Sequence, residues 1–185
     1  MNRKDLKDLL KADLLRLALR EDGTHENKPK IINWFSPRFT PVLIIRLARY
    51  VYLKPRLRIF SSLLTWLNVF LFGVECTPKC PIGPGLFLPH TVGTVIGASQ
   101  IGSNATIFQG VTLGSISIDL FFNEELRPIV GNNVVIGSGA KVLGGISIGN
   151  DAKIGANSVV LNPVDSGSFV VGIPSSVYVA SKNKK

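Results

Sequence analysis

Histidine and cysteine are scarce in this sequence, which contains two of each among 185 residues. Two histidines exclude any site that needs three imidazoles from one chain. Two cysteines cannot build a disulfide framework. No arginine-then-apolar signal segment opens the chain. We therefore expect the protein to work in a reducing cytoplasm.

Acidic residues are also few, with 12 Asp+Glu against 21 Lys+Arg and a formal net charge of +9. The excess is uneven, because residues 1–75 hold 14 Lys+Arg and 7 Asp+Glu, whereas residues 76–185 hold 7 and 5. Only Gly23 and Gly73 of the 18 glycines fall in the first 75 residues. These shifts predict a helical region over 1–73, a second domain over 74–180 and a basic tail over 181–185. No basic motif interleaved with aromatic residues is present, so we expect no nucleic-acid partner.

Helical spacing marks the first region. Leucines recur at helical intervals from residue 4 to residue 20, and Thr40-Pro41 is typical of an N-cap followed by proline at the first helical position. We predict helices over 4–20, 41–53 and 55–72, with Gly73 as the stop. His25 lies in the polar loop between the first two helices and is assigned no role.

The last two predicted helices are unusually apolar. Residues 59–74 are 16 uncharged residues in a row, which as a helix would span roughly 24 Å, less than a hydrocarbon core of about 30 Å. A transmembrane span is therefore not expected. The apolar face would be buried against the second domain or another subunit, and a cationic stretch without acids would favour peripheral contact with an anionic membrane. The cations of that stretch are Arg38, Arg46, Arg49, Lys54, Arg56 and Arg58.

The second region repeats every six residues. Aliphatic residues recur at this spacing in two runs: Val95, Ile101, Ile107 and Leu113, then Val130, Ile136, Val142, Ile148, Ile154 and Val160. A period of six fits neither an isolated helix nor a half-buried strand. It is typical of a solenoid in which three short strands form one triangular coil of about 18 residues.

In such a coil, one aliphatic residue of each hexapeptide points inward and stacks on its equivalents about 4.8 Å away. The backbone then turns sharply, and glycine or asparagine tolerates the turn. Asparagines occur at the expected turns: Asn104, Asn132, Asn133, Asn150 and Asn157. We predict a mainly β fold, a parallel β-helix preceded by a small N-terminal α-helical region.

The repeat is interrupted twice. Leu88 and Val95 are seven residues apart, so one extra residue lies near His90, and the chain leaves the coil over 118–128. Loops that leave a solenoid are frequent sites of function.

The two cysteines, Cys76 and Cys80, are too few soft ligands for a metal site, and we expect buried free thiols and no metal.

Six short motifs occur in a fixed order along the second region. They are Val74-Glu75-Cys76-Thr77-Pro78, Ile82-Gly83-Pro84-Gly85-Leu86, Pro89-His90-Thr91-Val92-Gly93, Phe108-Gln109-Gly110-Val111-Thr112-Leu113-Gly114, Ile136-Gly137-Ser138-Gly139-Ala140-Lys141-Val142-Leu143-Gly144 and Val171-Gly172-Ile173-Pro174. With them the chain resembles the hexapeptide-repeat acetyltransferases over about residues 40–180, specifically the serine O-acetyltransferase branch, which includes short enzymes that acetylate surface polysaccharides. The resemblance implies a left-handed β-helix, a homotrimer, and acetyl-CoA as a co-substrate bound between subunits, with no tightly bound cofactor. Whether trimers pair further is left open.

The resemblance also assigns site residues. The family's catalytic histidine falls on His90, and the carboxylate that orients it falls on Glu75, where the family usually has aspartate. The backbone positions that hold the pantetheine arm fall on Ser115 and Ser138. The lysine near the nucleotide end of coenzyme A falls on Lys153.

Two departures concern the acceptor. The family histidine that helps to bind the serine carboxylate falls on Arg127, and the arginine beside it falls on Leu126. These departures favour an acceptor other than free serine, and Arg127 could meet an acidic sugar.

An imidazole suits acetyl transfer to a hydroxyl, because its pKa lies near neutrality and a carboxylate on its second nitrogen fixes the tautomer. The sequence-based hypothesis is therefore a cytoplasmic O-acetyltransferase, peripheral at the inner face of the membrane. It would acetylate a sugar hydroxyl of a surface polysaccharide or its precursor, with His90 as base and Glu75 as orienting residue. The alternatives are serine O-acetyltransferase of cysteine biosynthesis and a purely structural β-helix.

Overall fold

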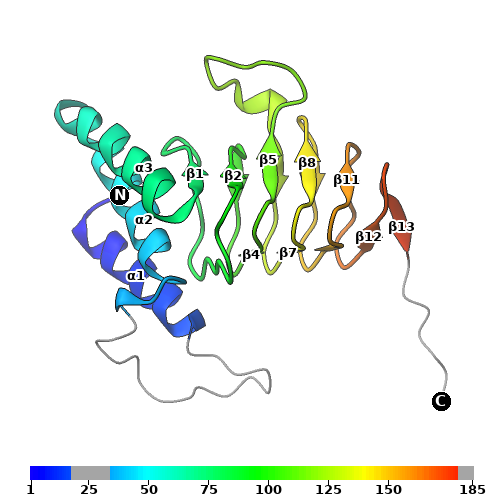
Figure 1. The fold of residues 1–185 in the computed structure, drawn as a ribbon, viewed down its shortest axis with the longest axis horizontal. Coiled ribbons are helices and arrows are strands. Elements are labelled where there is room, and N and C mark those ends of the chain that lie inside the picture. Colours follow the sequence, from blue (N-terminus) through cyan, green and yellow to red (C-terminus); the bar gives the residue numbers. More distant parts are fainter. Residues whose placement is uncertain (18–33, 179–185) are drawn as a thin grey trace.

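In the computed structural model, which describes residues 1–17 and 34–178, a parallel β-helix follows three α-helices (Figure 1). The helices are α1 (Arg3–Leu17), α2 (Thr40–Tyr52) and α3 (Arg58–Phe72), and the 3-10 turn η2 (Pro55–Leu57) joins the last two. Gly73 ends α3 in the left-handed conformation at φ 65°, as predicted. The Thr40 hydroxyl does not cap α2; it donates to the carbonyls of Trp34 and Ser36 instead.

Thirteen short strands are described, and all pair in parallel except β12 with β13. One sheet is β1 (Val74–Cys76), β2 (Thr94–Ile96), β5 (Thr112–Gly114), β8 (Lys141–Leu143) and β11 (Val159–Val160). A second is β3 (Gln100–Ile101), β6 (Ile129–Val130) and β9 (Ser147–Ile148). The third is β4 (Thr106–Ile107), β7 (Val135–Ile136), β10 (Lys153–Ile154), β12 (Phe169–Val171) and β13 (Ser176–Tyr178).

Stacked aliphatic residues form the core of the coils. The inward rows are buried, as the period of six predicts: Ile101, Ile107, Leu113, Val130, Ile136, Val142, Ile148, Ile154 and Val160. Three of the asparagines take left-handed turns, Asn104, Asn133 and Asn157, at φ between 56° and 57°. Asn132 and Asn150 instead accept backbone N–H groups of the neighbouring coil, from Ser103 and Asn132 respectively.

Val95 is the exception among the predicted inward residues. Ile96 pairs with Leu113 and is buried, whereas Val95 pairs with Thr112 on the outer face. The break near His90 therefore holds two extra residues rather than one, because eight positions separate Phe87 from Val95 where six separate their partners, Thr106 and Thr112. The next hexapeptide is one residue short and restores the register.

A buried ion pair attaches the helices to the first coil. Asp13 of α1 accepts from Arg46 of α2 at 2.8 and 2.9 Å, and the two side chains are 0% and 2% exposed. Asp13 Oδ1 also accepts the backbone N–H groups of Gly85 and Leu86. Arg46 donates onward to the carbonyls of Ile82 and Gly83.

Arg49 is likewise committed within the chain, since it donates to the carbonyls of Pro78 and Lys79 at 2.9 Å each. The expectation that Arg46 and Arg49 present charge to a membrane is therefore wrong. No helix within residues 1–17 and 34–178 is long and apolar enough to cross a membrane. His25 and the basic tail over 181–185 lie outside the described residues.

Candidate active site

The outer face of the first sheet carries the predicted carboxylate. Strand alternation buries Val74 and Cys76 and turns Glu75 outward. Glu75 pairs with Val95, which pairs in turn with Thr112, so these three residues form one outward row across β1, β2 and β5. The row supplies a carboxylate beside small and aliphatic neighbours.

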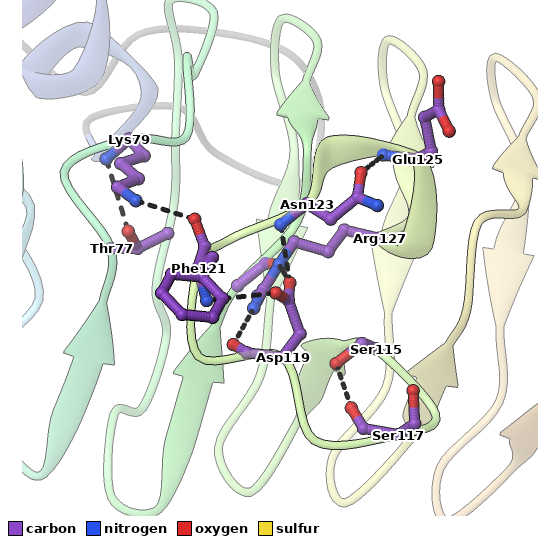
Figure 2. A network of polar contacts seen from close by, with 10 residues as sticks. Thr77, Lys79, Ser115, Ser117, Asp119, Phe121, Asn123, Glu125 and Arg127 are labelled. Atoms are coloured by element: carbon purple, nitrogen blue, oxygen red, sulfur yellow. Dashed lines mark hydrogen bonds and ion pairs between the residues drawn. The ribbon is translucent and has the colours of Figure 1, made fainter.

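The loop that leaves the coil after β5 is held by an ion pair at its base (Figure 2). Arg127 Nε donates to Asp119 Oδ2 at 2.9 Å, and its two terminal nitrogens donate to the carbonyls of Gly97 and Asp119. The guanidinium also lies 4.2 Å from the ring centroid of Phe122. Asp119 accepts the backbone N–H groups of Phe121 and Asn123 as well.

This network perturbs the Asp119 carboxyl. Burial disfavours its charged form, but the hydrogen bonds from Arg127 and from the Asn123 N–H outweigh that cost and hold the pKa of Asp119 below its ordinary value. The carboxylate is therefore ionised at neutral pH and organises the loop. We call residues 115–127 the stapled loop, and its 3-10 turn is η3 (Glu124–Leu126).

A cavity of about 420 Å³ separates the stapled loop from the first sheet. Its lining residues are Glu75, Thr77, Lys79, Val95, Ile96, Gly97, Thr112, Leu113, Gly114, Ser115, Asp119, Leu120, Phe122 and Arg127. Three predicted site residues thus meet here: Glu75, Ser115 and Arg127. The Ser115 hydroxyl donates to the Ser117 carbonyl at 2.6 Å.

His90 lies at the corner of the solenoid where the chain turns into β2 of the first sheet. Four backbone hydrogen bonds stack the turns of that corner: Gly93 to Gly73, Gly110 to Val92, Gly139 to Gln109 and Asn157 to Ser138. The corner therefore aligns the His90 turn with the turns at 108–110 and at 137–139. His90 and Ser138 share one edge of the solenoid, two coils apart, with the turn at 108–110 between them.

Within a single chain, His90 and Glu75 do not form the predicted hydrogen bond. His90 is exposed in the double insertion, and no hydrogen bond joins it to Glu75 in the described part of the chain. Gly93 nevertheless donates to Gly73 at 3.0 Å, which brings the segment after His90 beside the start of β1. Lys153 lies elsewhere, exposed on β10, whose strand leads into the same corner.

The two thiols are buried and free, as predicted. Burial raises the pKa of Cys76 well above its ordinary value, and burial raises the pKa of Cys80 to about 12. Both therefore stay protonated at neutral pH, which removes them as nucleophiles.

Three features of the site were missed from sequence. Asp119 and Lys79 both line the cavity, and Gln109, at the His90 corner, has a buried Oε1 without a hydrogen-bond partner. Gln109 lies within one of the six short motifs of the second region. The acid Asp119 and the base Arg127 are eight residues apart, and this spacing could have indicated an ion pair within the loop. Nothing in the sequence pattern places Lys79 opposite the stapled loop.

Comparisons with known proteins agree on one group. The family model described as bacterial transferase hexapeptide (six repeats) matches residues 127–162. A serine acetyltransferase of Helicobacter pylori is 42% identical over 159 residues, covering 85% of this chain and 90% of its own. One from Synechococcus elongatus is 40% identical over 167 residues, covering 90% of this chain and 66% of its own.

Solved structures give the same result. The crystal structure of a Neisseria gonorrhoeae serine acetyltransferase superposes with a TM-score of 0.85 at 30% identity, covering 98% of this chain and 69% of that one. A serine acetyltransferase in complex with CoA superposes with a TM-score of 0.82, also at 30% identity, covering 95% of this chain and 71% of that one.

Proposed function

Since the chain belongs to the serine acetyltransferase branch of the hexapeptide-repeat transferases, we propose that it transfers the acetyl group of acetyl-CoA to the side-chain hydroxyl of serine. The observation that carries the proposal is the similarity to the Helicobacter pylori enzyme, at 42% identity across 90% of that protein. Acetyl-CoA is the co-substrate, and the coils are proposed to wind left-handed as in this family.

The expectation that the protein acetylates a surface polysaccharide is wrong. It depended on the substitutions at Leu126 and Arg127, but the matched relatives and structures are serine acetyltransferases. Two loop positions are a weaker guide to the acceptor than similarity over most of the chain. Arg127 also acts within the stapled loop, so its identity reports loop structure as well as the acceptor.

His90 is the proposed general base. Its imidazole would take the proton of the serine hydroxyl as the oxygen attacks the thioester carbonyl, forming the C–O bond. The resulting oxyanion collapses, the C–S bond breaks, and the imidazolium returns its proton to the departing coenzyme A thiolate. Glu75 would orient the imidazole through its second nitrogen, as in hydrolase triads.

The donor would lie along the corner that begins at His90. The stacked turns run from the His90 turn past 108–110 to Ser138, which gives an extended thioester a row of backbone groups beside the base. Lys153, on β10 beside this corner, is the proposed contact for the nucleotide end. Ser115 directly follows β5 of the first sheet, lines the cavity, and is the second proposed contact for the pantetheine arm.

A homotrimer is proposed as the working assembly, with α3 in its contact. Eight large apolar side chains of α3 are exposed: Ile59, Phe60, Leu63, Trp66, Leu67, Val69, Phe70 and Leu71. We call them the α3 face. Within the described chain α3 buries only Ser61 and Asn68, so of the two partners expected for its apolar face, the second domain and another subunit, we propose the other subunit. A cavity of about 330 Å³ lined by Thr65, Trp66, Val69 and Glu75 connects this face to the site, so a subunit on α3 would close over Glu75.

Contact with an anionic membrane stays a prediction, and fewer cations than expected are available for it. Arg56 and Arg58 are exposed beside the α3 face, whereas Arg46 and Arg49 are used inside the chain. Arg38 is exposed as well, so three of the six cations on which the expectation depended are exposed.

The direct test is thiol release from acetyl-CoA with and without L-serine. The proposal predicts serine-dependent release that falls roughly 10²–10⁴-fold in His90→Ala, while acetyl-CoA binding by calorimetry stays nearly unchanged. A His90→Ala protein that keeps most of its kcat would remove His90 from the mechanism. Absence of serine-dependent release in the unaltered protein would contradict the proposed function.

A further inference from the structure

If the serine proposed as acceptor enters the cavity beside Glu75, it brings a carboxylate to a site that already holds two acids. Glu75 and Asp119 both line the 420 Å³ cavity, and a third negative charge there is unfavourable without a cation beside it. Within the described lining, the cationic side chains are Lys79 and Arg127. One of these two must therefore receive the carboxylate, unless another chain supplies a cation.

Arg127 is poorly placed for that task. Three of its five N–H donors are committed to Asp119 and to the Gly97 carbonyl, and its side chain is 12% exposed. Releasing it would unpair Asp119 and free the loop that Asp119 organises. The neighbouring position is Leu126, which offers no charge.

Lys79, unlike Arg127, has hydrogen-bond donors that are available to a ligand. It is exposed in the turn after β1, and its Nζ donates to the Phe121 carbonyl at 3.2 Å (Figure 2). The same nitrogen lies 5.2 Å from the ring centroid of Phe122. No carboxylate lies within 4.0 Å of this ammonium among residues 1–17 and 34–178. An ammonium has three donors, so two remain after the bond to Phe121.

The Lys79 backbone is also held in place. Arg49 of α2 donates to the carbonyls of Pro78 and Lys79, and the Lys79 N–H donates to the Thr77 hydroxyl at 3.3 Å. The turn therefore presents its lysine on a braced backbone between β1 and the stapled loop. This arrangement gives Arg49, expected to face a membrane, a role in positioning Lys79.

We propose that Lys79 binds the carboxylate of the acceptor, with its Nζ donating a charge-assisted hydrogen bond to a carboxylate oxygen. The proposal rests on the proposed function, because it assigns the carboxylate subsite of a serine-acetylating enzyme. Lys79 would act in binding and would take no part in proton transfer. Its loss should therefore raise KM for serine far more than it lowers kcat.

The experiment compares L-serine with L-serinamide, whose neutral amide replaces the carboxylate. Lys79→Gln should raise KM for L-serine roughly 10- to 100-fold, the loss expected for a hydrogen bond to a charged group, and leave kcat within about threefold. Its kcat/KM for L-serinamide should be unchanged. Lys79→Arg, which keeps the charge, should recover part of the serine KM.

Lys7→Gln is the matched control, since it removes the same charge from an exposed position on α1, and its KM should match that of the unaltered protein. An unchanged serine KM in Lys79→Gln, with normal serine turnover in the unaltered protein, would overturn the Lys79 assignment alone. Equal losses for serine and serinamide would also overturn it, because they would show a structural role. No serine turnover in the unaltered protein would overturn the proposed function, and the Lys79 assignment with it.

Discussion

Asp13 and Arg46 form a buried two-point ion pair that joins α1, α2 and the first coil of the β-helix. Asp13 also accepts two backbone N–H groups, and Arg46 donates to two carbonyls of the same coil. The pair thus serves as the polar joint between the helical region and the solenoid. Removal of either partner leaves a buried charge and unsatisfied backbone groups.

Asp13→Ala should therefore lower the free energy of unfolding by about 3–5 kcal/mol, the range for breaking a buried ion pair. Denaturant unfolding followed by circular dichroism measures the change. Asp8→Ala, an exposed position on the same helix, is the control and should stay within about 0.5 kcal/mol. A loss below 1 kcal/mol in Asp13→Ala would show that the joint contributes little.

Glu75→Gln tests the orienting role. The amide keeps the shape of the side chain but removes the charge that supports an imidazolium, so kcat should fall roughly 10²–10⁴-fold with acetyl-CoA affinity preserved. Glu75→Asp, the residue usual in the family, should retain more activity. Glu124→Gln, an exposed glutamate of η3, is the charge-matched control. Equal rates for Glu75→Gln and the unaltered protein would remove Glu75 from the mechanism.

Asp119→Asn tests the stapled loop. Its side chain would lose the ion pair with Arg127 and weaken the bonds from the Phe121 and Asn123 N–H groups, so amide hydrogen exchange should accelerate at those two residues. The serine KM should rise, since the loop forms one wall of the cavity. Asp165→Asn, an exposed position beyond the loop, should leave both quantities unchanged.

The same network predicts a pH dependence. The pKa of Asp119 lies below its ordinary 3.8 in the folded protein, so the contribution of the network is present above pH 3.8 and is lost as the pH falls through the lower folded value. Protection of the Asn123 amide should thus persist at pH 4.5. Loss of that protection between pH 6 and pH 5 would contradict the assigned ion pair.

The α3 face predicts the assembly. Light scattering should give a multiple of three times 20.0 kDa, and the pair Trp66→Ser and Phe70→Ser should shift the mass towards the monomer. A fully active monomer would contradict a site shared between subunits.

The membrane prediction is tested with the exposed cations. The triple variant Arg38→Gln, Arg56→Gln and Arg58→Gln should keep the mass but abolish any salt-sensitive binding to anionic vesicles. Vesicle binding that survives the arginine substitutions would contradict the narrowed membrane prediction.

The period of six predicted most of the solenoid because each inward position makes the same contact with its neighbours. Val95 was misassigned because two extra residues near His90 are followed by one missing residue before Ile101, and the errors nearly cancel in sequence. Arg46 and Arg49 were misread because their partners lie 29 to 37 residues away. Local pattern cannot reveal a pairing that only the docking of helices on a coil creates.

For the site, the motifs predicted positions on the solenoid but not their mutual contacts. Glu75, Ser115 and Arg127 share a cavity, whereas His90 lies at the adjacent corner. Arg127 was assigned to the acceptor because its charge is visible in the sequence. Its ion pair with Asp119 could not be predicted, because that contact forms only when the loop folds. Irregular loops have no periodicity from which such a contact could be predicted.

A competition for limiting acetyl-CoA tests the central claim most directly. The protein is incubated with equal concentrations of L-serine and a nucleotide-linked sugar, and the acetylated products are identified by NMR. The account predicts O-acetylserine as the dominant product, formed by the unaltered protein and lost in His90→Ala. Acetylation of the sugar alone, with serine recovered unchanged, would contradict it.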